Sequence, residues 1–333
     1  MSGLGRLANA SNARSTLLAL AGLSCILATA VISASSHDLI TDSWDWSGAT
    51  LGGLAWPSLG VVAACSAVHY VAAAVATQAA TSRSLQTRET VLVQLCAATA
   101  NKLTPAGLGG SAVLARYLHR RAGLSTASAA GTVSVIALGR AAAALLTLGV
   151  LDIAGPWFGL DGGSTELARL VRETQALLVA HPWLLLALVS VAAVSIVLAV
   201  RARSAARRFA QPLRDIVRSP GPALTILAAS AAQTLVLGGA FAAAVSVLPG
   251  THPSMSTGAL IVGYIAATAA AAAVPLPGGI GSGEAALTAV LVSGHVGLGH
   301  AGADVLLFRI MTLWLPAAAG LPCARVLRQR SAL

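Results

Sequence analysis

Charged side chains are scarce in this sequence. Asp, Glu, Lys and Arg together make up 10% of the 333 residues, whereas hydrophobic residues make up 56%. In soluble proteins, roughly a quarter of the residues are charged. This composition therefore excludes a soluble domain and predicts an all-α fold, a polytopic membrane helix bundle.

Lysine is almost missing as well. Lys102 is the only lysine, and arginine supplies nearly all of the positive charge behind the net charge of +10. In a membrane protein, positive charge first indicates which loops face the cytoplasm. We therefore interpret the arginines as a topology signal and expect no nucleic acid among the partners.

Cysteine and histidine are too few and too scattered to form a recognisable site. The seven histidines and four cysteines show no spacing typical of metal ligands, and no Walker motif for nucleotide binding is present. We expect no cofactor, no metal and no disulfide framework. The isolated cysteines are Cys25, Cys65, Cys96 and Cys323.

Proline and glycine, by contrast, concentrate in residues 275–284. This stretch holds two prolines and four glycines between two apolar runs, so a helix cannot continue through it. Irregular backbone at membrane depth is tolerated only inside protein or beside a water-filled cavity. Glu284 ends the stretch, and an intramembrane carboxylate is a functional candidate by default. The alternative is a surface loop with an acidic residue in the first turn of the next helix.

A second break resembles the first. Residues 105–109 match residues 277–281 in kind, and the two stretches are 172 positions apart. An Ala-Ala-Thr run precedes each break, and an arginine embedded in an apolar run follows each, Arg140 in one case and Arg309 in the other. This agreement predicts that the two halves of the chain are repeats of each other.

The arginines give the two halves opposite orientations. Loop 36–48 has acids and tryptophans but no Lys or Arg, so it is predicted outside, whereas 81–89 and 201–218 are predicted inside. Segment 201–218 is either a basic helix on anionic headgroups or a plain linker. A cleaved signal peptide is an alternative for the first apolar run. The predicted spans are 16–33, 51–80, 125–150, 177–200, 222–248 and 304–321.

We therefore predict one membrane domain over 1–333. Its first half is 16–150, its second half is 177–322, and a basic cytoplasmic linker covers 201–220. Each half contains a Pro/Gly-broken re-entrant hairpin, and the two halves have inverted topology, which is a transporter signature. Ten crossings with the breaks at the membrane surface are the alternative. Both models place the two termini in the cytoplasm, in a multi-pass protein of the cytoplasmic membrane.

The second break and the segments after it resemble a known family. Residues 275–287, followed by Phe308-Arg309 and 314–316, are similar to the transmembrane region of lysylphosphatidylglycerol synthases, which are flippase-like membrane proteins. Residues 104–110 look like the family's earlier motif, but Gly110-Ser111 stands where the family often has Gly-Glu. The resemblance covers roughly 19–328 and implies a protein that binds or moves a lipid. It does not imply lysyl-lipid synthesis, which needs an additional soluble domain.

The candidate site combines the two breaks with the charges beside them. Arginine suits phosphate because it donates in a fork, and the break glycines could offer backbone N–H groups or simply allow close packing. Glu284 and Arg309 are predicted to pair, either in a headgroup site or as a structural ion pair. The predicted substrate-binding residues are Lys102, Pro105, Gly107, Gly109, Arg140, Pro277, Gly278, Gly279, Gly281, Glu284 and Arg309.

Three functions remain open from the sequence. The leading one is a flippase-like transporter that binds or translocates an anionic phospholipid or a phosphate-linked lipid. The second is an intramembrane lipid-modifying enzyme; Ser282 is the only nucleophile near Glu284 and no histidine lies in the motif, so we do not expect catalysis. The third is a scaffold for a separate lipid synthase. Expected partners are anionic membrane lipids, with a homo-oligomer or a lipid synthase as further candidates.

Overall fold

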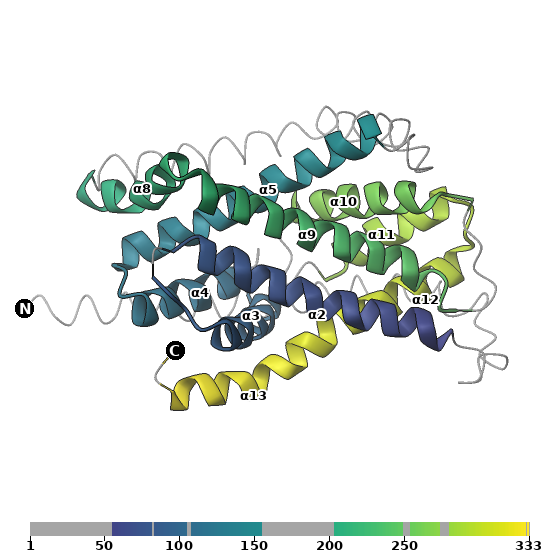
Figure 1. Cartoon of the computed structure of the whole chain (residues 1–333). Helices are drawn as coiled ribbons and strands as arrows, with labels where there is room; N and C mark the ends of the chain where they lie inside the picture. Colours follow the sequence, from purple (N-terminus) through teal and green to yellow (C-terminus); the bar gives the residue numbers. More distant parts are fainter. Residues whose placement is uncertain are drawn as a thin grey trace, which may run out of the picture.

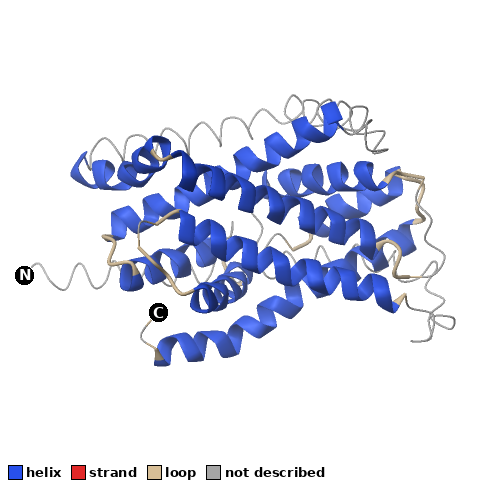
Figure 2. Ribbon diagram, in the orientation of Figure 1, coloured by secondary structure: helices blue, strands red, loops and turns tan. Residues whose placement is uncertain are grey.

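The computed structural model describes residues 55–81, 83–104, 108–154, 203–248, 254–273, 280–330 and 332. Within these ranges the regular structure is entirely helical (Figure 2). The predicted spans 16–33 and 177–200 and the loop 36–48 lie outside the described residues. The helices are α2 (Trp56–Ala79), α3 (Thr87–Lys102), α4 (Leu108–Arg121), α5 (Thr126–Ala154), α8 (Arg203–Arg218), α9 (Pro220–Ala244), α10 (Thr257–Ala273), α11 (Ser282–Ser293), α12 (Leu298–Arg309), the π-turn η4 (Ile310–Trp314) and α13 (Leu315–Gln329).

Among the described residues, four helices are long and apolar enough to cross a membrane. They are Trp56–Ala79, Thr126–Leu151, Pro220–Ala244 and Leu298–Gln329. Each overlaps a span predicted from the sequence, so the prediction of a polytopic helical membrane bundle is confirmed. The runs of Ala, Leu and Val present apolar side chains to the lipid. They fold as helices because a helix satisfies its backbone hydrogen bonds within the segment.

The last span is longer than the sequence indicated. We expected 304–321, but the helix begins at Leu298, directly after Gly297, and reaches Gln329. The glycines around 300 therefore do not prevent helix formation. A π-turn over Ile310–Trp314 interrupts this span just before Pro316, which has no N–H to donate to the preceding turn.

Two pairs of short helices flank the two breaks. At ~1.5 Å per residue, α3 and α4 reach about 24 Å and 21 Å, and α10 and α11 about 26 Å and 18 Å, all short of a ~30 Å hydrocarbon core. In Figure 1, α3 and α4 lie toward the end of the bundle that holds α8 and the C-terminus, whereas α10 and α11 lie toward the opposite end. The two pairs therefore lie in opposite halves of the bundle along its long axis.

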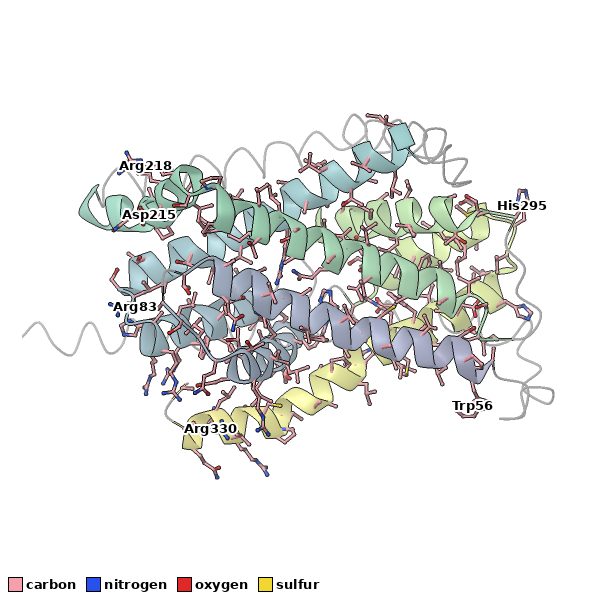
Figure 3. The ribbon with its side chains drawn as sticks, viewed as in Figure 1. Trp56, Arg83, Asp215, Arg218, His295 and Arg330 are labelled. Carbon is pink, nitrogen blue, oxygen red and sulfur yellow. The ribbon has the colours of Figure 1, made fainter. Side chains whose placement is uncertain are left out.

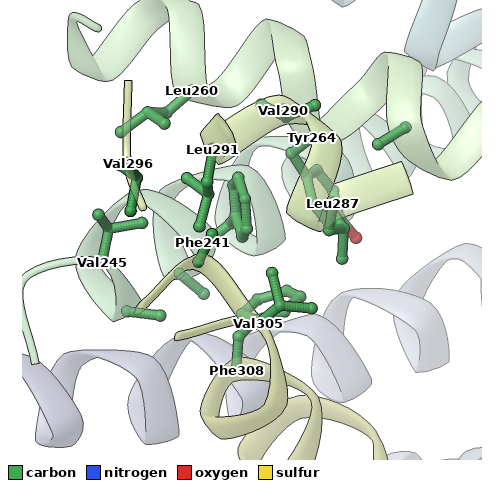
Figure 4. Close-up of a cluster of buried hydrophobic side chains, with 14 of the residues drawn as sticks. Phe241, Val245, Leu260, Tyr264, Leu287, Val290, Leu291, Val296, Val305 and Phe308 are labelled. Atoms are coloured by element: carbon green, nitrogen blue, oxygen red, sulfur yellow. The ribbon is translucent and has the colours of Figure 1, made fainter. Parts of the chain in front are cut away.

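Each pair of short helices has its own apolar core. The core around α10 and α11 centres on three aromatic rings from three helices, Phe241, Tyr264 and Phe308, whose centroids are 5.5 to 6.0 Å apart (Figure 4). The core around α3 and α4 includes Tyr117 and Leu118, which are fully buried. Edge-to-face aromatic contacts of this kind add to the packing energy, so α9, α10 and α12 are held together at one point.

Small residues bring α13 directly onto α3. A Cβ atom on Gly320 would collide with the side chain of Thr99 and the backbone carbonyl of Leu95. Thr99 Oγ1 donates to the carbonyl of Ala317 at 2.6 Å, and the Cys96 thiol lies 3.4 Å from the Gly320 carbonyl. The two backbones therefore touch, as is usual where glycine or alanine lines a membrane helix interface.

Charged side chains gather at one end of the bundle. Arg83, Arg218 and Arg330 lie at that end, and Trp56 lies at the other (Figure 3). Segment 203–218, for which the sequence allowed a helix or a linker, is the helix α8 and packs against α5 and α9. The asymmetry along the long axis is the pattern expected of a bundle whose basic end faces the cytoplasm.

An ion pair ties the basic end together. The guanidinium of Arg121, at the end of α4, donates from Nε to Glu89 Oε1 at 2.7 Å and from a second nitrogen to the Arg330 carbonyl at 2.9 Å. Arg121 thus joins α3, α4 and the C-terminal end of α13.

Candidate functional site

A cavity of about 330 Å³ lies where the two predicted halves meet. Helices α2, α3, α4 and α5 form one side of it, and α9, α10, α12 and η4 form the other. Its lining mixes apolar residues with polar ones such as Tyr70, Asn101, Ser111 and Thr268. A concave, mostly preformed space with a few converging polar groups is the usual form of a small-ligand site.

Three cationic side chains converge on this cavity. Lys102 comes from the last turn of α3, Arg140 from the middle of α5, and Arg309 from the end of α12. Like charges repel when they are brought together in a low-dielectric environment, so this arrangement is costly unless anions compensate it.

Glu284 compensates one of these cations. Arg309 Nε donates to Glu284 Oε1 at 2.7 Å, and the two side chains are 12% and 22% exposed. The other carboxylate oxygen, Oε2, accepts the backbone N–H of Gly281 at 2.6 Å. Glu284 is therefore both the counter-charge of Arg309 and the cap of α11, and it does not itself line the cavity.

Two glycines make this pairing possible. Gly281, the residue before α11, has a φ of +87°, a region that favours glycine. Gly283 is buried, and a Cβ atom there would collide with the Arg309 guanidinium. The glycines of the second break thus bring backbone and guanidinium into contact.

Arg140 has a different environment. It stands in the middle of a membrane-length helix and borders the cavity. It forms no ion pair with any carboxylate of the described residues. An arginine held within a membrane span and open to an internal cavity is a binding-site candidate.

Lys102 belongs to the same electrostatic group. It interacts with both Arg309 and Glu284, although it lies in the other half of the chain. The charged residues that flank the two breaks therefore come together at one place, as the sequence suggested for a shared site. Whether the break residues themselves meet lies outside the described residues.

At the first break, neutral side chains do the capping. The N–H of Gly109 donates to Thr104 Oγ1 at 2.7 Å, and the N–H of Gly110 donates to Asn101 Oδ1 at 2.6 Å. We had expected the N–H groups of Gly109 and Gly281 to be offered to a phosphate or to serve close packing. In this structure both N–H groups are used inside the protein, because Thr104 accepts from Gly109 and Glu284 accepts from Gly281.

The structure thus places the predicted residues in two groups. Lys102, Arg140 and Arg309 line the cavity, while Glu284, Gly109 and Gly281 lie behind it at helix ends. The predicted residues that lie outside the described ranges are Pro105, Gly107, Pro277, Gly278 and Gly279.

Sequence reasoning missed several polar lining residues. His69 and Tyr70 from α2 and Gln94 and Asn101 from α3 border the cavity. Gln94 also donates to the Ala73 carbonyl and to Thr77 Oγ1, which fixes α3 against α2. The sequence did contain a signal for two of them. Gln94 and Asn101 are both amides, and because they are seven residues apart they lie on one face of a helix.

No metal site emerges from the part of the chain that the structure describes. It holds no group of three or more His, Cys, Asp or Glu side chains placed to bind a metal ion.

Comparison with known families decides the relationship of the chain. The model of the lysylphosphatidylglycerol synthase transmembrane region matches residues 18–320. The chain belongs to this family. The match includes both breaks, all four membrane-length helices up to Gly320 and every residue of the cavity described above.

Family membership supports a lipid-related role in a multi-pass membrane protein. The comparison with curated proteins gives no match. At the first break, Gly110 and Ser111 both line the cavity. The site therefore has a carboxylate beside Arg309 but none at the corresponding place of the first break.

Proposed function

We propose that this protein binds the anionic headgroup of a lipid in the central cavity and moves that lipid across the cytoplasmic membrane. The observation that carries the proposal is the convergence of Lys102, Arg140 and Arg309 on one cavity between the two halves. A phosphate offers the charge that would compensate these cations, and arginine binds its oxygens in a forked geometry.

The arrangement of the short helices supports a transport mechanism. Because α3–α4 and α10–α11 lie toward opposite ends of the bundle, we propose that they are re-entrant hairpins of two inverted halves. Rocking of one half against the other would then open the cavity to each membrane face in turn. The basic end, which carries Arg83 and Arg330, would face the cytoplasm together with both termini.

We propose transport in preference to catalysis. Ser282, the nucleophile candidate, is oriented toward the carbonyl of Ala271 at 3.5 Å. Glu284 is engaged by Arg309 and by the backbone of Gly281, so it is poorly placed to act as a base for this serine. A purified protein that leaves the headgroup of an offered lipid unchanged would agree with this interpretation.

Reconstitution in liposomes tests the proposal. Phosphatidylglycerol with a fluorescent acyl chain is placed in both leaflets, and a membrane-impermeant reductant then reports how much of it reaches the outer leaflet. The protein should accelerate exchange over protein-free vesicles, and Arg140→Gln should remove most of this acceleration. Arg116→Gln serves as the control, because Arg116 is exposed on α4 and does not line the cavity.

Failure of the wild-type protein to move any anionic lipid would overturn the proposal and favour the scaffold function. A homo-oligomer or a separate lipid synthase would then be the partner to seek, since a scaffold acts only with another protein.

A further inference from the structure

One wall of the central cavity, formed by α2 and α3, carries an unused hydrogen-bond acceptor. Gln94 on α3 donates from Nε2 to the Ala73 carbonyl at 3.3 Å and to Thr77 Oγ1 at 2.7 Å, both on α2. Because a backbone carbonyl can only accept, the amide nitrogen must face Ala73, and this fixes the orientation of the side chain. Among the described residues no group donates to the amide oxygen, Oε1, which is therefore left as an acceptor on a side chain that lines the cavity.

His69 supplies a second acceptor on the same wall. It precedes Ala73 by one turn of α2, so the two residues share a face of that helix, and His69 also lines the cavity. Its buried Nδ1 has no hydrogen-bond partner among the described residues. In the neutral ring with the proton on Nε2, Nδ1 is an acceptor. Buried polar atoms without partners are costly, so both acceptors call for a donor from a bound ligand.

A lipid phosphate by itself does not satisfy these acceptors. The oxygens of an ionised phosphodiester only accept, so they suit the donors of the cavity, such as the Arg140 guanidinium. They also suit the NH₂ group of Asn101, whose Oδ1 is held by the Gly110 N–H at 2.6 Å. A ligand that completes the hydrogen bonding of the cavity must therefore bring donors of its own in addition to a phosphate.

We propose that Gln94 Oε1 and His69 Nδ1 form a hydroxyl subsite, so that the favoured ligand is an anionic lipid whose headgroup carries hydroxyl groups beyond its phosphate. The inference rests on the proposed function and specifies its substrate class. The hydroxyl groups of a glycerol or inositol headgroup lie only a few bonds from the phosphate, and each donates one hydrogen bond. One headgroup can thus serve the donors and the acceptors of the cavity together.

An ammonium headgroup also donates hydrogen bonds, but it suits this wall less well. Arg140 is close enough to His69 to interact with it electrostatically, and the described lining of the cavity contains no Asp or Glu. An ammonium group bound at His69 would therefore lie near a like charge without a carboxylate in the lining to offset it. A neutral hydroxyl group donates without this repulsion.

Competition between lipids that differ in their headgroup hydroxyls tests the inference. The purified protein in detergent is offered dioleoyl phosphatidylglycerol and dioleoyl phosphatidylpropanol, which has the same charge and nearly the same size but no headgroup hydroxyl. Native mass spectrometry counts the bound copies, and we expect phosphatidylglycerol to bind about tenfold more tightly. Dioleoyl phosphatidylinositol is then compared with both. Whichever hydroxylated lipid binds more tightly identifies the source of the hydroxyl groups.

Variants connect the preference to the two acceptors. Gln94→Met, which keeps the side-chain length without the amide, and His69→Leu should each reduce the preference to about threefold or less. His69→Asn, which retains an amide oxygen, should keep more of the preference than His69→Leu. Gln78→Met is the matched control, because Gln78 makes the same kind of contacts, to the Leu85 carbonyl at 2.8 Å and to Thr87 Oγ1 at 3.0 Å, but does not line the cavity. Its preference should equal that of the wild type.

The measurement is the ratio of the two affinities, which a purely structural role would not change. Losing the Gln94 contacts to α2 loosens the packing and weakens the binding of every lipid alike, whereas losing an acceptor weakens only the hydroxylated ones. Melting curves in the same detergent show which variants are folded, and His69→Leu carries the test if Gln94→Met unfolds.

The outcomes that would overturn the inference differ from those that would overturn the proposed function. Equal binding of the hydroxylated lipids and phosphatidylpropanol, weakened alike by Arg140→Gln, would refute the hydroxyl subsite and leave the proposed function intact. A preference that survives both Gln94→Met and His69→Leu would refute the assignment to these two residues. Binding of none of the three lipids would refute the subsite and the proposed function together.

Discussion

At the scale of single residues, Glu284 and Arg309 compensate each other's charge. Either charge alone would be costly in the apolar interior of the bundle. The sequence predicted the pair because both charges lie in or beside apolar runs, and the structure joins them at 2.7 Å. It also shows that Glu284 caps α11 through the Gly281 N–H. That second contact could not be predicted, because it depends on the backbone conformation of a glycine.

The first prediction concerns the removal of charge from the Glu284–Arg309 pair. Glu284→Gln should lower the free energy of unfolding by about 2 kcal/mol, below the ~3–5 kcal/mol of a fully buried pair, because both side chains keep some exposure. The double variant Glu284→Gln/Arg309→Met should regain most of that stability, since no lone charge remains. It should not regain transport, because a cavity cation is lost. Thermal melting in detergent and lipid exchange in liposomes measure the two effects.

The ion pair at the basic end is a matched control. Glu89 and Arg121 make the same contact at the same 2.7 Å, but neither lines the central cavity. Glu89→Gln should reduce stability and leave lipid exchange per folded protein unchanged. A stable Glu284→Gln/Arg309→Met protein that exchanges lipid at the wild-type rate would show that the Glu284–Arg309 pair is purely structural.

At the scale of elements, the contact between α3 and α13 fixes one wall of the cavity. α3 carries Lys102 at its end, and α13 continues the span that carries Arg309. The close backbone approach at Gly320 therefore connects the positions of two cavity cations. The sequence indicated small residues at helix interfaces in general, but not which helices meet, since that depends on packing across more than 200 residues of chain.

Filling this contact gives the second prediction. Gly320→Ala places a methyl group against the Leu95 carbonyl, which is backbone and cannot rotate away, so α13 must shift outward. We expect a loss of about 2 kcal/mol of stability and slower lipid exchange. Gly239→Ala on α9 is the control, because nothing lies within 4 Å of its added Cβ. Equal melting temperatures for the two variants would mean that α13 does not press on α3.

At the scale of the whole molecule, the distribution of arginine predicts the orientation. Arg83 and Arg330 lie at one end of the bundle and Trp56 at the other. The positive-inside rule predicts that the first end faces the cytoplasm. A labelling experiment at the two ends tests this orientation.

Cysteine accessibility gives the third prediction. In a background without the native cysteines, Ser84→Cys at the basic end and Ser254→Cys at the opposite end are both exposed positions. A membrane-impermeant maleimide added to intact cells should label the Ser254 site, and it should label the Ser84 site only after permeabilisation. The reverse pattern would invert the topology and contradict the prediction of cytoplasmic termini.

The sequence by itself determined the membrane class, the described spans, the short helices beside each break and the candidate cations. These follow from local properties: apolar run length, the conformational limits of proline and glycine, and the cost of a charge in an apolar segment. Only the tertiary structure decided that Lys102, Arg140 and Arg309 share one cavity, that Glu284 also accepts the Gly281 N–H, and that Asn101 and Thr104 accept the N–H groups of the first break. Those contacts join residues from different helices or depend on a single turn of backbone, so no spacing in the sequence specifies them.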